Sequence, residues 1–594
     1  MILAVFEVPF TSFQVPLEVV VLGLVTGLIY ALLGIGLVIV YKSSRVINFA
    51  HGEMGALAAS LIPVLVISRH WNYWAALVVG LAAAAAAGAV TELVVIRKLT
   101  KAPRLIVLVA TIGISQLFYA IGAFIPKDDL GSAVFPTPFD LAVTIGSLRL
   151  DSGRILIVVA VPVLALGVTV FFRRTRLGLA SRAAAENNDA ARLAGVPVRK
   201  VSLAVWTIAG VLAGASAILV GPTQPIVTRV ALGPSLMLRA LAAAMIGGMV
   251  SLPAVFAGGI FIGLTEQLVL WNYPTGGVLE ITLFAIILGS LLVRKGFGAL
   301  ARGAESSSWS LAGSLRQLPP TVARLPQIRA AKVAMIGGLI ALSVLLPVPF
   351  SNAHRVLLTS IVVFATMGLS LVVLTGFAGQ VSLGQFAFVG LGAIVGGRMH
   401  ELGYPPWMAL LYAAIAGGLV ALAIGLPALR LRGLFLAVTT LGFAVAAQGW
   451  LYQQRWLVHN VGGRSSLEIP RPTLWGVDFQ DERNYYWLCL VVLVITATAV
   501  NRLRVSGIGR AMMAVRDNEP AAATLAVPPR RIKLIAFVLA GMIASVAGYF
   551  YGGLLVSFSE PSTFAVELSL ALVAMVILGG VTTITGSILG ALWL

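Results

Sequence analysis

The chain has 594 residues, of which 59% are hydrophobic and only 11% are charged, and its formal net charge is +19. Soluble domains are about 45–50% apolar and about 25% charged, and disordered chains combine low hydrophobicity with high charge. Both classes are excluded, and the composition predicts an all-α fold, a polytopic helical membrane protein.

Apolar runs of spanning length, about 20 residues each, follow one another through the first half of the chain. We expect membrane segments at about 19–41, 46–68, 74–96, 105–125, 154–172, 201–221, 235–250, 253–272 and 277–294. The single cysteine, Cys489, excludes an internal disulfide and a cysteine-based metal site, and no metal site is expected.

The segments between the spans differ in charge, and this difference predicts the orientation of the chain. Residues 97–104 hold four basic residues, and residues 173–200 hold seven basic and two acidic residues. Residues 126–153 hold two basic and four acidic residues. Because Lys and Arg accumulate in cytoplasmic loops, we place the N-terminus outside and the 173–200 loop in the cytoplasm. The positive charge is then explained by topology, and no nucleic-acid partner is expected.

Residues 295–332 interrupt the apolar pattern. This stretch contains Gly, Ser and Pro and six basic residues against Glu305. It is typical of a cytoplasmic linker, here between a first permease domain at 1–294 and a second at 333–594. The alternative is one continuous bundle with a long loop, although long structureless loops are uncommon within one compact unit.

The two halves of the chain match each other. Residues 178–187 reappear as 509–518, and Val196-Pro197 reappears as Val527-Pro528, both 331 residues later. Three further pairs keep nearly that spacing: Thr111 with Thr440 (329), Gly34 with Gly368 (334), and Gly247-Gly248 with Gly579-Gly580 (332). A nearly constant offset along the chain indicates a duplication.

The charge pattern predicts that the two copies are parallel. Residues 501–533 hold seven basic and two acidic residues, like their partner loop, so both loops are expected in the cytoplasm. The second copy then needs one additional helix, which the apolar run at about 333–348 supplies. Two parallel copies imply a pseudo-two-fold axis along the membrane normal.

Each copy carries a short candidate helix inside its basic loop. Asn187 and Asn518 are suited to cap a helix start, and Gly195, Pro197 and Pro528 are suited to end it. Such short helices are marginal in water, which favours a docking partner; a duplicated loop that simply keeps its packing is an equal alternative. The candidate coupling residues are Arg182, Glu186, Asn187, Ala190, Ala191, Gly195, Arg516, Asp517, Asn518, Pro520, Ala521 and Ala522.

Polar residues near the second span form the other candidate site. Polar groups near spans usually face a cavity or the protein interior, so these residues could line a translocation path or its gate. Hydrogen-bonded packing between helices is the alternative that we favour slightly. The candidates are Asn48, His51 and Glu53 in the first copy, Gln380, Ser382 and Gln385 in the second, and Thr111 and Thr440.

Motifs for catalysis are absent from the sequence. It contains no G-x-x-x-x-G-K-[ST], H-E-x-x-H or G-x-S-x-G, so we expect no enzyme activity, no catalytic residue and no ATP site in this chain. Glu92 and Glu266 lie in or near spans but do not form the chain of acids typical of proton-coupled pumps.

Several motifs resemble the permeases of branched-chain amino acid ABC importers. Ile47–Glu53, Ala110–Gly113 and Arg182–Asn187 resemble one permease subunit, and Gly376–Gly384, Arg430–Ala437 and Arg516–Glu519 resemble its companion, so both subunits are expected to be fused in one chain. One departure is Asn188-Asp189, where the family usually has Asn-Pro; the two coupling loops are therefore not expected to dock identically.

The resemblance implies a function and a set of partners. A periplasmic binding protein would deliver leucine, isoleucine or valine, and two ABC ATPase subunits in the cytoplasm would bind ATP, the only cofactor of the system. The chain itself would lie in the lipid bilayer of the bacterial inner membrane. Import of urea or short amides is one alternative, and a secondary transporter or channel that needs no ATPase is another. Because the second copy stops at Leu594, four residues past Gly590, the match of Gly258, we expect it to lack its last helices or to continue, perhaps into an ATPase domain.

Overall fold

The structure is a computed structural model of the chain. It describes residues 5–593 apart from 8–13, 101, 103, 126–133, 146–147, 224–233, 276, 294–324, 430, 432, 455, 462–463, 470, 472, 475–476 and 559–560. Most of the expected linker, residues 295–324, therefore lies outside the described residues, as do Lys127, Asp128 and Asp129 of the acidic loop. Contacts divide the chain into two compact units, residues 1–300 with 441–450 and residues 301–440 with 451–594. The second half of one helix of the second copy, residues 441–450, is thus grouped with the first unit.

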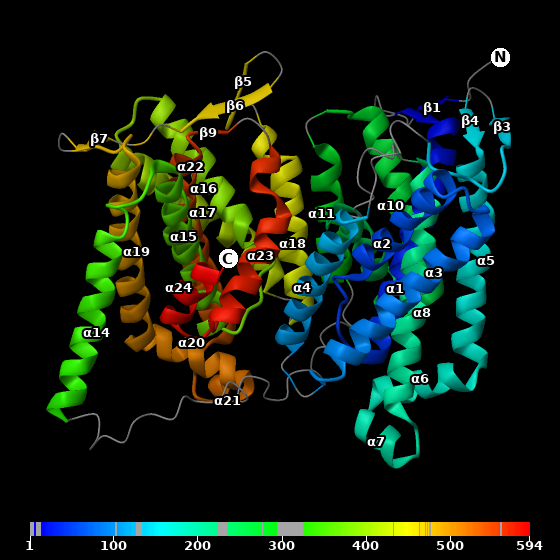
Figure 1. The fold of residues 1–594 in the computed structure, drawn as a ribbon, viewed down its shortest axis with the longest axis horizontal. Helices are drawn as coiled ribbons and strands as arrows, with labels where there is room; N and C mark the ends of the chain where they lie inside the picture. Colours follow the sequence, from blue (N-terminus) through cyan, green and yellow to red (C-terminus); the bar gives the residue numbers. More distant parts are fainter. Residues whose placement is uncertain are drawn as a thin grey trace. The chain divides into compact units, whose positions relative to one another are not determined.

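Helices make up almost all of the first unit (Figure 1). They are α1 (Leu17–Ser44), α2 (His51–Pro63), α3 (Tyr73–Val90), α4 (Arg104–Ala123), α5 (Ser152–Arg174), α6 (Arg176–Glu186), α7 (Asn188–Leu193), α8 (Val198–Val220), α9 (Pro234–Ile246), α10 (Leu252–Asn272) and α11 (Val278–Val293). A π-helical turn continues α2 over Val64–Ser68 and another continues α3 over Thr91–Ile96.

The second unit repeats this order after one preceding helix. Its helices are α14 (Pro326–Leu345), α15 (Asn352–Leu371), α16 (Gln385–Glu401), α17 (Pro406–Ala428), α18 (Leu434–Gly449), α19 (Glu482–Val505), α20 (Gly507–Asp517), α21 (Glu519–Thr524), α22 (Pro529–Leu555), α23 (Val566–Gly579) and α24 (Ile584–Trp593). A π-helical turn, Val372–Phe377, continues α15.

The strands are short and antiparallel. They pair as β1 (Val5–Glu7) with β2 (Gln14–Pro16), β3 (Ala142–Ile145) with β4 (Leu148–Asp151), β6 (Arg464–Glu468) with β5 (His459–Val461) and β9 (Ser557–Phe558), and β7 (Thr473–Leu474) with β8 (Val477–Asp478). They belong to connections between helices, and the all-α prediction is confirmed.

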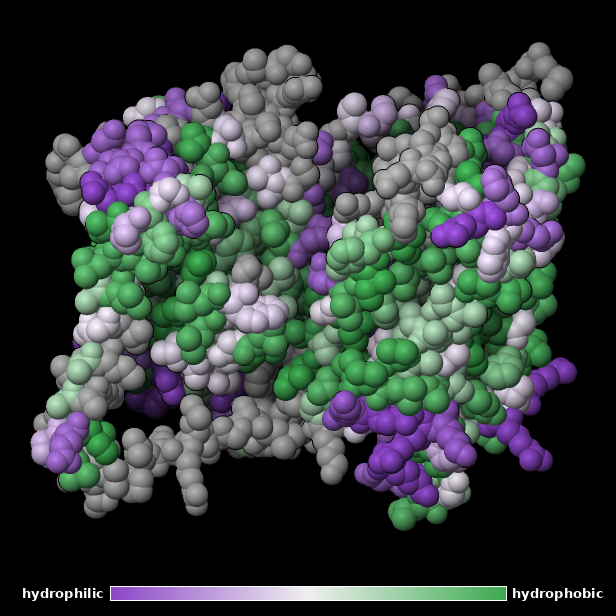
Figure 2. All heavy atoms as spheres, viewed as in Figure 1, coloured by the Kyte–Doolittle hydropathy of each residue, from purple (hydrophilic) through white to green (hydrophobic). Residues whose placement is uncertain are grey.

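Twelve helices among the described residues are long and apolar enough to span a membrane, or thirteen if the bent pair α23–α24 counts as one span. In Figure 2 the visible side of each unit is apolar over its middle and polar toward its ends. Large apolar side chains are exposed there, such as Val78, Leu166 and Leu419, each at least 60% exposed. This surface is favourable only against lipid, which agrees with a multi-pass membrane protein.

Most expected spans of the first half match a helix within about three residues, and the differences have local causes. The expected span 46–68 begins only at His51, because Arg45 adopts a left-handed φ of 55° and ends α1. The expected span 235–250 is a helix only to Ile246, after which Gly248 and Met249 have positive φ. The additional helix expected at 333–348 begins earlier, at Pro326, so the end of the expected linker is helical.

The helix boundaries repeat at the offsets predicted from the sequence. The ends α6 and α20, α7 and α21, and the starts of α8 and α22 all lie 331 residues apart, and the starts of α2 and α16 lie 334 residues apart. The two units are therefore structural duplicates along this part of the chain.

Glycines allow close helix packing in the first unit. A Cβ added to Gly263 would lie 2.3 Å from the Cα of Gly27, and one added to Gly259 would lie 2.5 Å from the Cα of Ala31. Helices α1 and α10 therefore meet backbone to backbone, as small residues permit in membrane bundles.

Candidate functional site

Each unit contains a non-helical interruption between its first two helices. We call these interruptions the helix breaks: residues 45–50 between α1 and α2, and residues 378–384 between the π-turn after α15 and helix α16. Backbone groups at such a break lose their helical partners and need others.

In the first unit, a threonine and an asparagine supply these partners. The backbone N–H of Phe49 donates to Thr111 Oγ1 at 3.3 Å, and the N–H of Ala50 donates to Asn48 Oδ1 at 3.0 Å. Thr111 in turn donates to the carbonyl of Leu108 at 2.7 Å. Asn48 and Thr111 are completely buried.

The second unit uses the same arrangement. The N–H of Leu383 donates to Thr440 Oγ1 at 2.9 Å, and the N–H of Gly384 donates to Ser382 Oγ at 3.4 Å. Leu383 and Ser382 lie 334 residues after Phe49 and Asn48. These four predicted polar residues, two in each unit, therefore satisfy the backbone at the break, which is the packing role among the two alternatives.

The residue that begins the helix after each break differs between the units. In the first unit this residue is His51, whose ring is buried against Gly36, so closely that a Cβ on Gly36 would lie 2.5 Å from the ring atoms Cε1 and Nε2. In the second unit it is Gln385, whose Nε2 donates to Ser370 Oγ at 3.0 Å and to the carbonyl of Ala540 at 3.1 Å. Ser370 is the residue 334 positions after Gly36, so a histidine on glycine has been exchanged for a glutamine on serine.

Three buried side chains at the breaks keep polar atoms without a hydrogen bond among the described residues. They are both ring nitrogens of His51, both amide atoms of Gln380 and Oε1 of Gln385. Glu53, in the first turn of α2, is only partly buried. Of the pathway candidates, His51 and Gln380 therefore retain unused hydrogen-bonding capacity, whereas Asn48, Thr111, Ser382 and Thr440 do not depend on a ligand.

The two basic loops contain the short helices that the sequence predicted. We call residues 176–195 and 507–526 the coupling segments; each consists of an eleven-residue helix (α6 or α20), an Asn and a six-residue helix (α7 or α21). Asn187 Oδ1 accepts from the N–H groups of Asp189 and Ala190 at 3.1 and 3.0 Å, and Asn518 Oδ1 accepts from Ala521 N at 3.0 Å. Both residues are N-caps, as predicted.

The short helices end alike but with different residues. The N–H of Val196 reaches the carbonyl of Ala191, and the N–H of Val527 reaches that of Ala522, which is the hydrogen bond of a Schellman motif. The preceding residue is left-handed in both: Gly195 with φ of 82° and Ala526 with φ of 59°. Ala526 thus holds a conformation that costs an L-residue about 1–2 kcal/mol.

Each coupling segment presents one alanine to its own unit and an apolar side chain to solvent. Ala191 and Ala522 are buried, whereas Ala190 and Ala521 are exposed. Figure 1 shows α7 at the extreme end of its unit, beyond the spans. Leu193 is 91% exposed and Leu525 78% exposed, so each segment ends in an unburied apolar side chain next to a rigid cap.

The remaining coupling candidates are placed as follows. Arg182, Glu186 and Asp517 are exposed on α6 and α20, and Pro520 occupies the first turn of α21. In the second unit, Glu519 pairs with Lys533 at 2.8 Å and so ties α21 to α22.

An arginine connects each coupling segment to the helix break of its own unit. In the first unit, Arg45 of the break donates through Nε to the carbonyl of Ala185 on α6 at 3.4 Å. In the second, Arg516 of α20 donates to the carbonyl of Gly376, at the end of the π-turn. Arg45 was not among the predicted site residues; the repeat offsets place it opposite Gly379 and place Ala185 opposite Arg516, which is the signal that could have found it.

The two acidic residues noted in or near spans are both paired. Glu266 of α10 bonds Arg239 of α9 at 2.8 Å with both side chains nearly buried, and Glu92 bonds Arg97 at 2.8 Å. The described residues hold no cluster of three or more His, Cys, Asp or Glu that could bind a metal ion.

Comparison with known proteins relates both halves to one family. The model of the branched-chain amino acid transport system / permease component family matches residues 19–293 and again residues 355–594. The chain is 30% identical over 281 residues to the high-affinity branched-chain amino acid transport system permease protein LivM of Escherichia coli K12, a match that covers 43% of this chain and 65% of that protein's length.

Two other relatives carry similar descriptions. The permease protein BraD of the corresponding system in Pseudomonas aeruginosa is 30% identical over 263 residues, which cover 42% of this chain and 85% of BraD. The permease protein LivH of Salmonella typhimurium is 29% identical over 284 residues, which cover 46% of this chain and 91% of LivH.

Proposed function

The chain belongs to the branched-chain amino acid transport system / permease component family and carries its module twice, and we propose that it is the membrane permease of an ABC importer for leucine, isoleucine and valine. Two ATPase subunits drive the transport from the cytoplasm, and a binding protein delivers the substrate from the periplasm. The chain lies in a bacterial inner membrane with its N-terminus outside. ATP is bound by the partner subunits, and this chain contributes no catalytic residue and no cofactor.

The observation that carries this proposal is the duplicated coupling segment. Helices as short as α7 and α21 do not hold together in water by propensity alone. Here both are capped at the start, closed at the end and tipped with an exposed leucine. A pre-ordered surface of this kind lowers the entropy that a docking partner must overcome, and its presence in both units suits two ATPase subunits.

The proposed partners make the coupling segments testable. Asn187→Ala with Asn518→Ala removes both caps, each of which contributes about 1 kcal/mol. We expect the chain to insert into membranes but to lose most of its co-purification with the ATPase subunits and most of its ATP-dependent leucine uptake. Asn72→Ala is the matched control, because Asn72 caps α3 through Trp74 N at 2.9 Å in a different loop.

Uptake by reconstituted vesicles decides between the candidate functions. The vesicles contain the chain, the ATPase subunits and the binding protein, and they are offered labelled leucine or labelled urea, with or without ATP. ATP-dependent leucine uptake supports the proposal. Full-rate uptake without ATPase subunits would identify a secondary transporter or channel, and preference for urea would identify an amide permease.

A further inference from the structure

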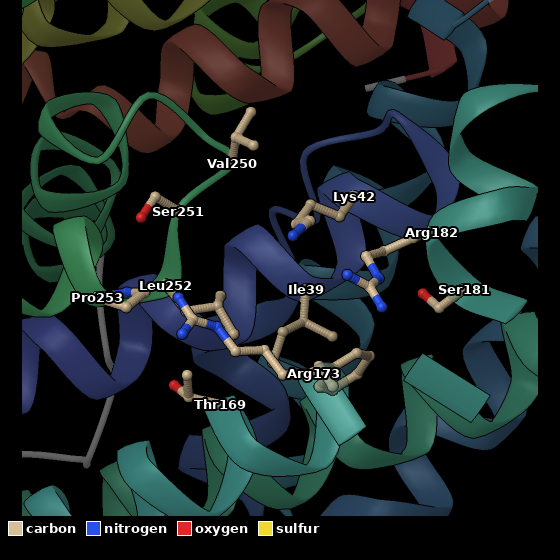
Figure 3. Close-up of a pocket in the computed structure, with 11 residues that line it drawn as sticks. Ile39, Lys42, Thr169, Arg173, Ser181, Arg182, Val250, Ser251, Leu252 and Pro253 are labelled. Carbon is tan, nitrogen blue, oxygen red and sulfur yellow. The ribbon is translucent and has the colours of Figure 1, made fainter. Parts of the chain in front are cut away.

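A basic pocket lies at one end of the first unit (Figure 3). It has a volume of about 120 Å³ and lies among the ends of α1 and α5, helix α6 and the turn between α9 and α10. Its lining includes Lys42, Arg173 and Arg182, one from each of three different helices. Figure 3 shows these three side chains reaching toward the same space.

The three cations have no carboxylate partner among the described residues. Elsewhere in the described chain, basic residues at helix ends or within helices do find one, as in the pairs of Arg97, Arg239 and Lys533. Lys42 is also close enough to Arg173 and Arg182 to be repelled by both. Convergence of like charges is unfavourable unless an anion lies among them.

The other groups that line the pocket also suit an anion. Ser251 is the N-cap of α10, and Leu252 and Pro253 form its first turn, so the positive end of a 21-residue helix faces the pocket. Ser181, whose side chain is buried, adds a hydroxyl donor. Cations, hydroxyls and a helix N-terminus are the donors that bind phosphate oxygens.

The repeat shows that this cluster is not a by-product of topology. The second copy has an equally basic loop, yet the residues at the matching offsets are Gly376 for Lys42 and Met513 for Arg182; Arg173 alone is matched, by Arg504. An excess of basic residues on one side of the membrane therefore does not require the cluster, and the first unit has it in addition.

We propose that this pocket binds one phosphate group. Three cations around one space match the charge of a phosphate, whereas a single carboxylate would leave positive charge uncompensated. Lys42 and Arg173 lie in the last three residues of their spans, which is the depth of a lipid headgroup. The phosphate therefore belongs either to an anionic lipid or to a soluble phosphate, and both sources present the same oxygens.

The test measures binding to the purified full chain in phosphatidylcholine nanodiscs. Fluorescent phosphatidylglycerol is added in one arm and ³²P-labelled inorganic phosphate in the other, at constant ionic strength. We expect saturable binding of one probe at one equivalent per chain. Competition by inorganic phosphate would assign a soluble ligand, and its failure to compete would assign the lipid.

Variants then locate the site. Lys42→Gln, Arg173→Gln and Arg182→Gln should each weaken binding by about 5-fold and together by about 100-fold, since a cation near an anionic headgroup contributes about that factor. Arg174→Gln is the matched control, because Arg174 is exposed beside Arg173 but does not line the pocket; its binding should stay within about 2-fold. If the triple variant fails to fold, the single variants carry the test. Non-saturable binding, wild-type affinity in the folded variants, or an equal loss in Arg174→Gln would overturn the proposal.

Discussion

Exchanging the residue pair at one helix break for its counterpart in the other unit tests whether the breaks are equivalent. The first unit has His51 on Gly36, and the second has Gln385 bonded to Ser370. The variant Gly36→Ser/His51→Gln transfers the second pair into the first unit. We expect the double variant to be more stable than the two single variants predict.

The size of this effect follows from the contacts. A Cβ on Gly36 would lie 2.5 Å from the His51 ring, so Gly36→Ser alone overpacks the core at a cost of about 1–3 kcal/mol. His51→Gln alone buries an amide beside a glycine that offers no hydroxyl, at a cost of about 1–3 kcal/mol. Together the serine gains room and the amide gains a partner, so the coupling free energy should be about 2–3 kcal/mol in the stabilising direction.

The measurement is the free energy of unfolding of the four proteins in mixed micelles, followed by tryptophan fluorescence during titration with a denaturing detergent. The reverse exchange, Ser370→Gly/Gln385→His, is the matched control and should show coupling of the same sign. Purely additive free energies in both cycles would refute the equivalence of the two breaks.

Two further predictions concern the buried ion pair and the ends of the short helices. Arg239→Leu or Glu266→Leu alone should destabilise the protein by about 3–5 kcal/mol, because each leaves an unpaired charge among buried groups, and the double variant should lose much less; equal losses in the same titration would contradict this. Ala526→Gly should protect the amides of α21 from hydrogen exchange by about 1 kcal/mol, and Gly195→Ala should expose those of α7 by a similar amount, since both positions are left-handed. No change in exchange at either helix would show that these ends are not strained.

The sequence was sufficient for the features that depend on local composition and on the repeat. Apolar runs of the right length predicted most helices, and Asn187 and Asn518 predicted the two short helices, because capping depends on a few neighbouring residues. The offset near 331 also predicted which helix boundaries would correspond.

Other features depend on contacts between distant segments and could not be predicted in this way. The sequence marked Asn48 and Thr111 as polar residues near spans, but it could not show that Thr111 accepts from the break 62 residues earlier in the chain. The pairing of Arg239 with Glu266 likewise requires the packing of α9 on α10. The late start of α2 at His51 reflects the left-handed Arg45, a conformation that composition does not reveal.

The two units preserve a connection rather than the residues that make it. Arg45 and Arg516 come from opposite partners, one from the helix break and the other from the coupling segment, yet each joins α6 or α20 to a helix break. A duplication that kept only packing would have no reason to retain this bond while exchanging its donor. If the coupling segments dock ATPase subunits as proposed, a displacement of either segment reaches a break directly through this arginine. Each break contains a buried polar side chain with unused hydrogen-bonding atoms, His51 in one unit and Gln380 in the other. The arginines therefore link the surface where a motor would act to the points of the two bundles where the backbone is least fixed by helical hydrogen bonds.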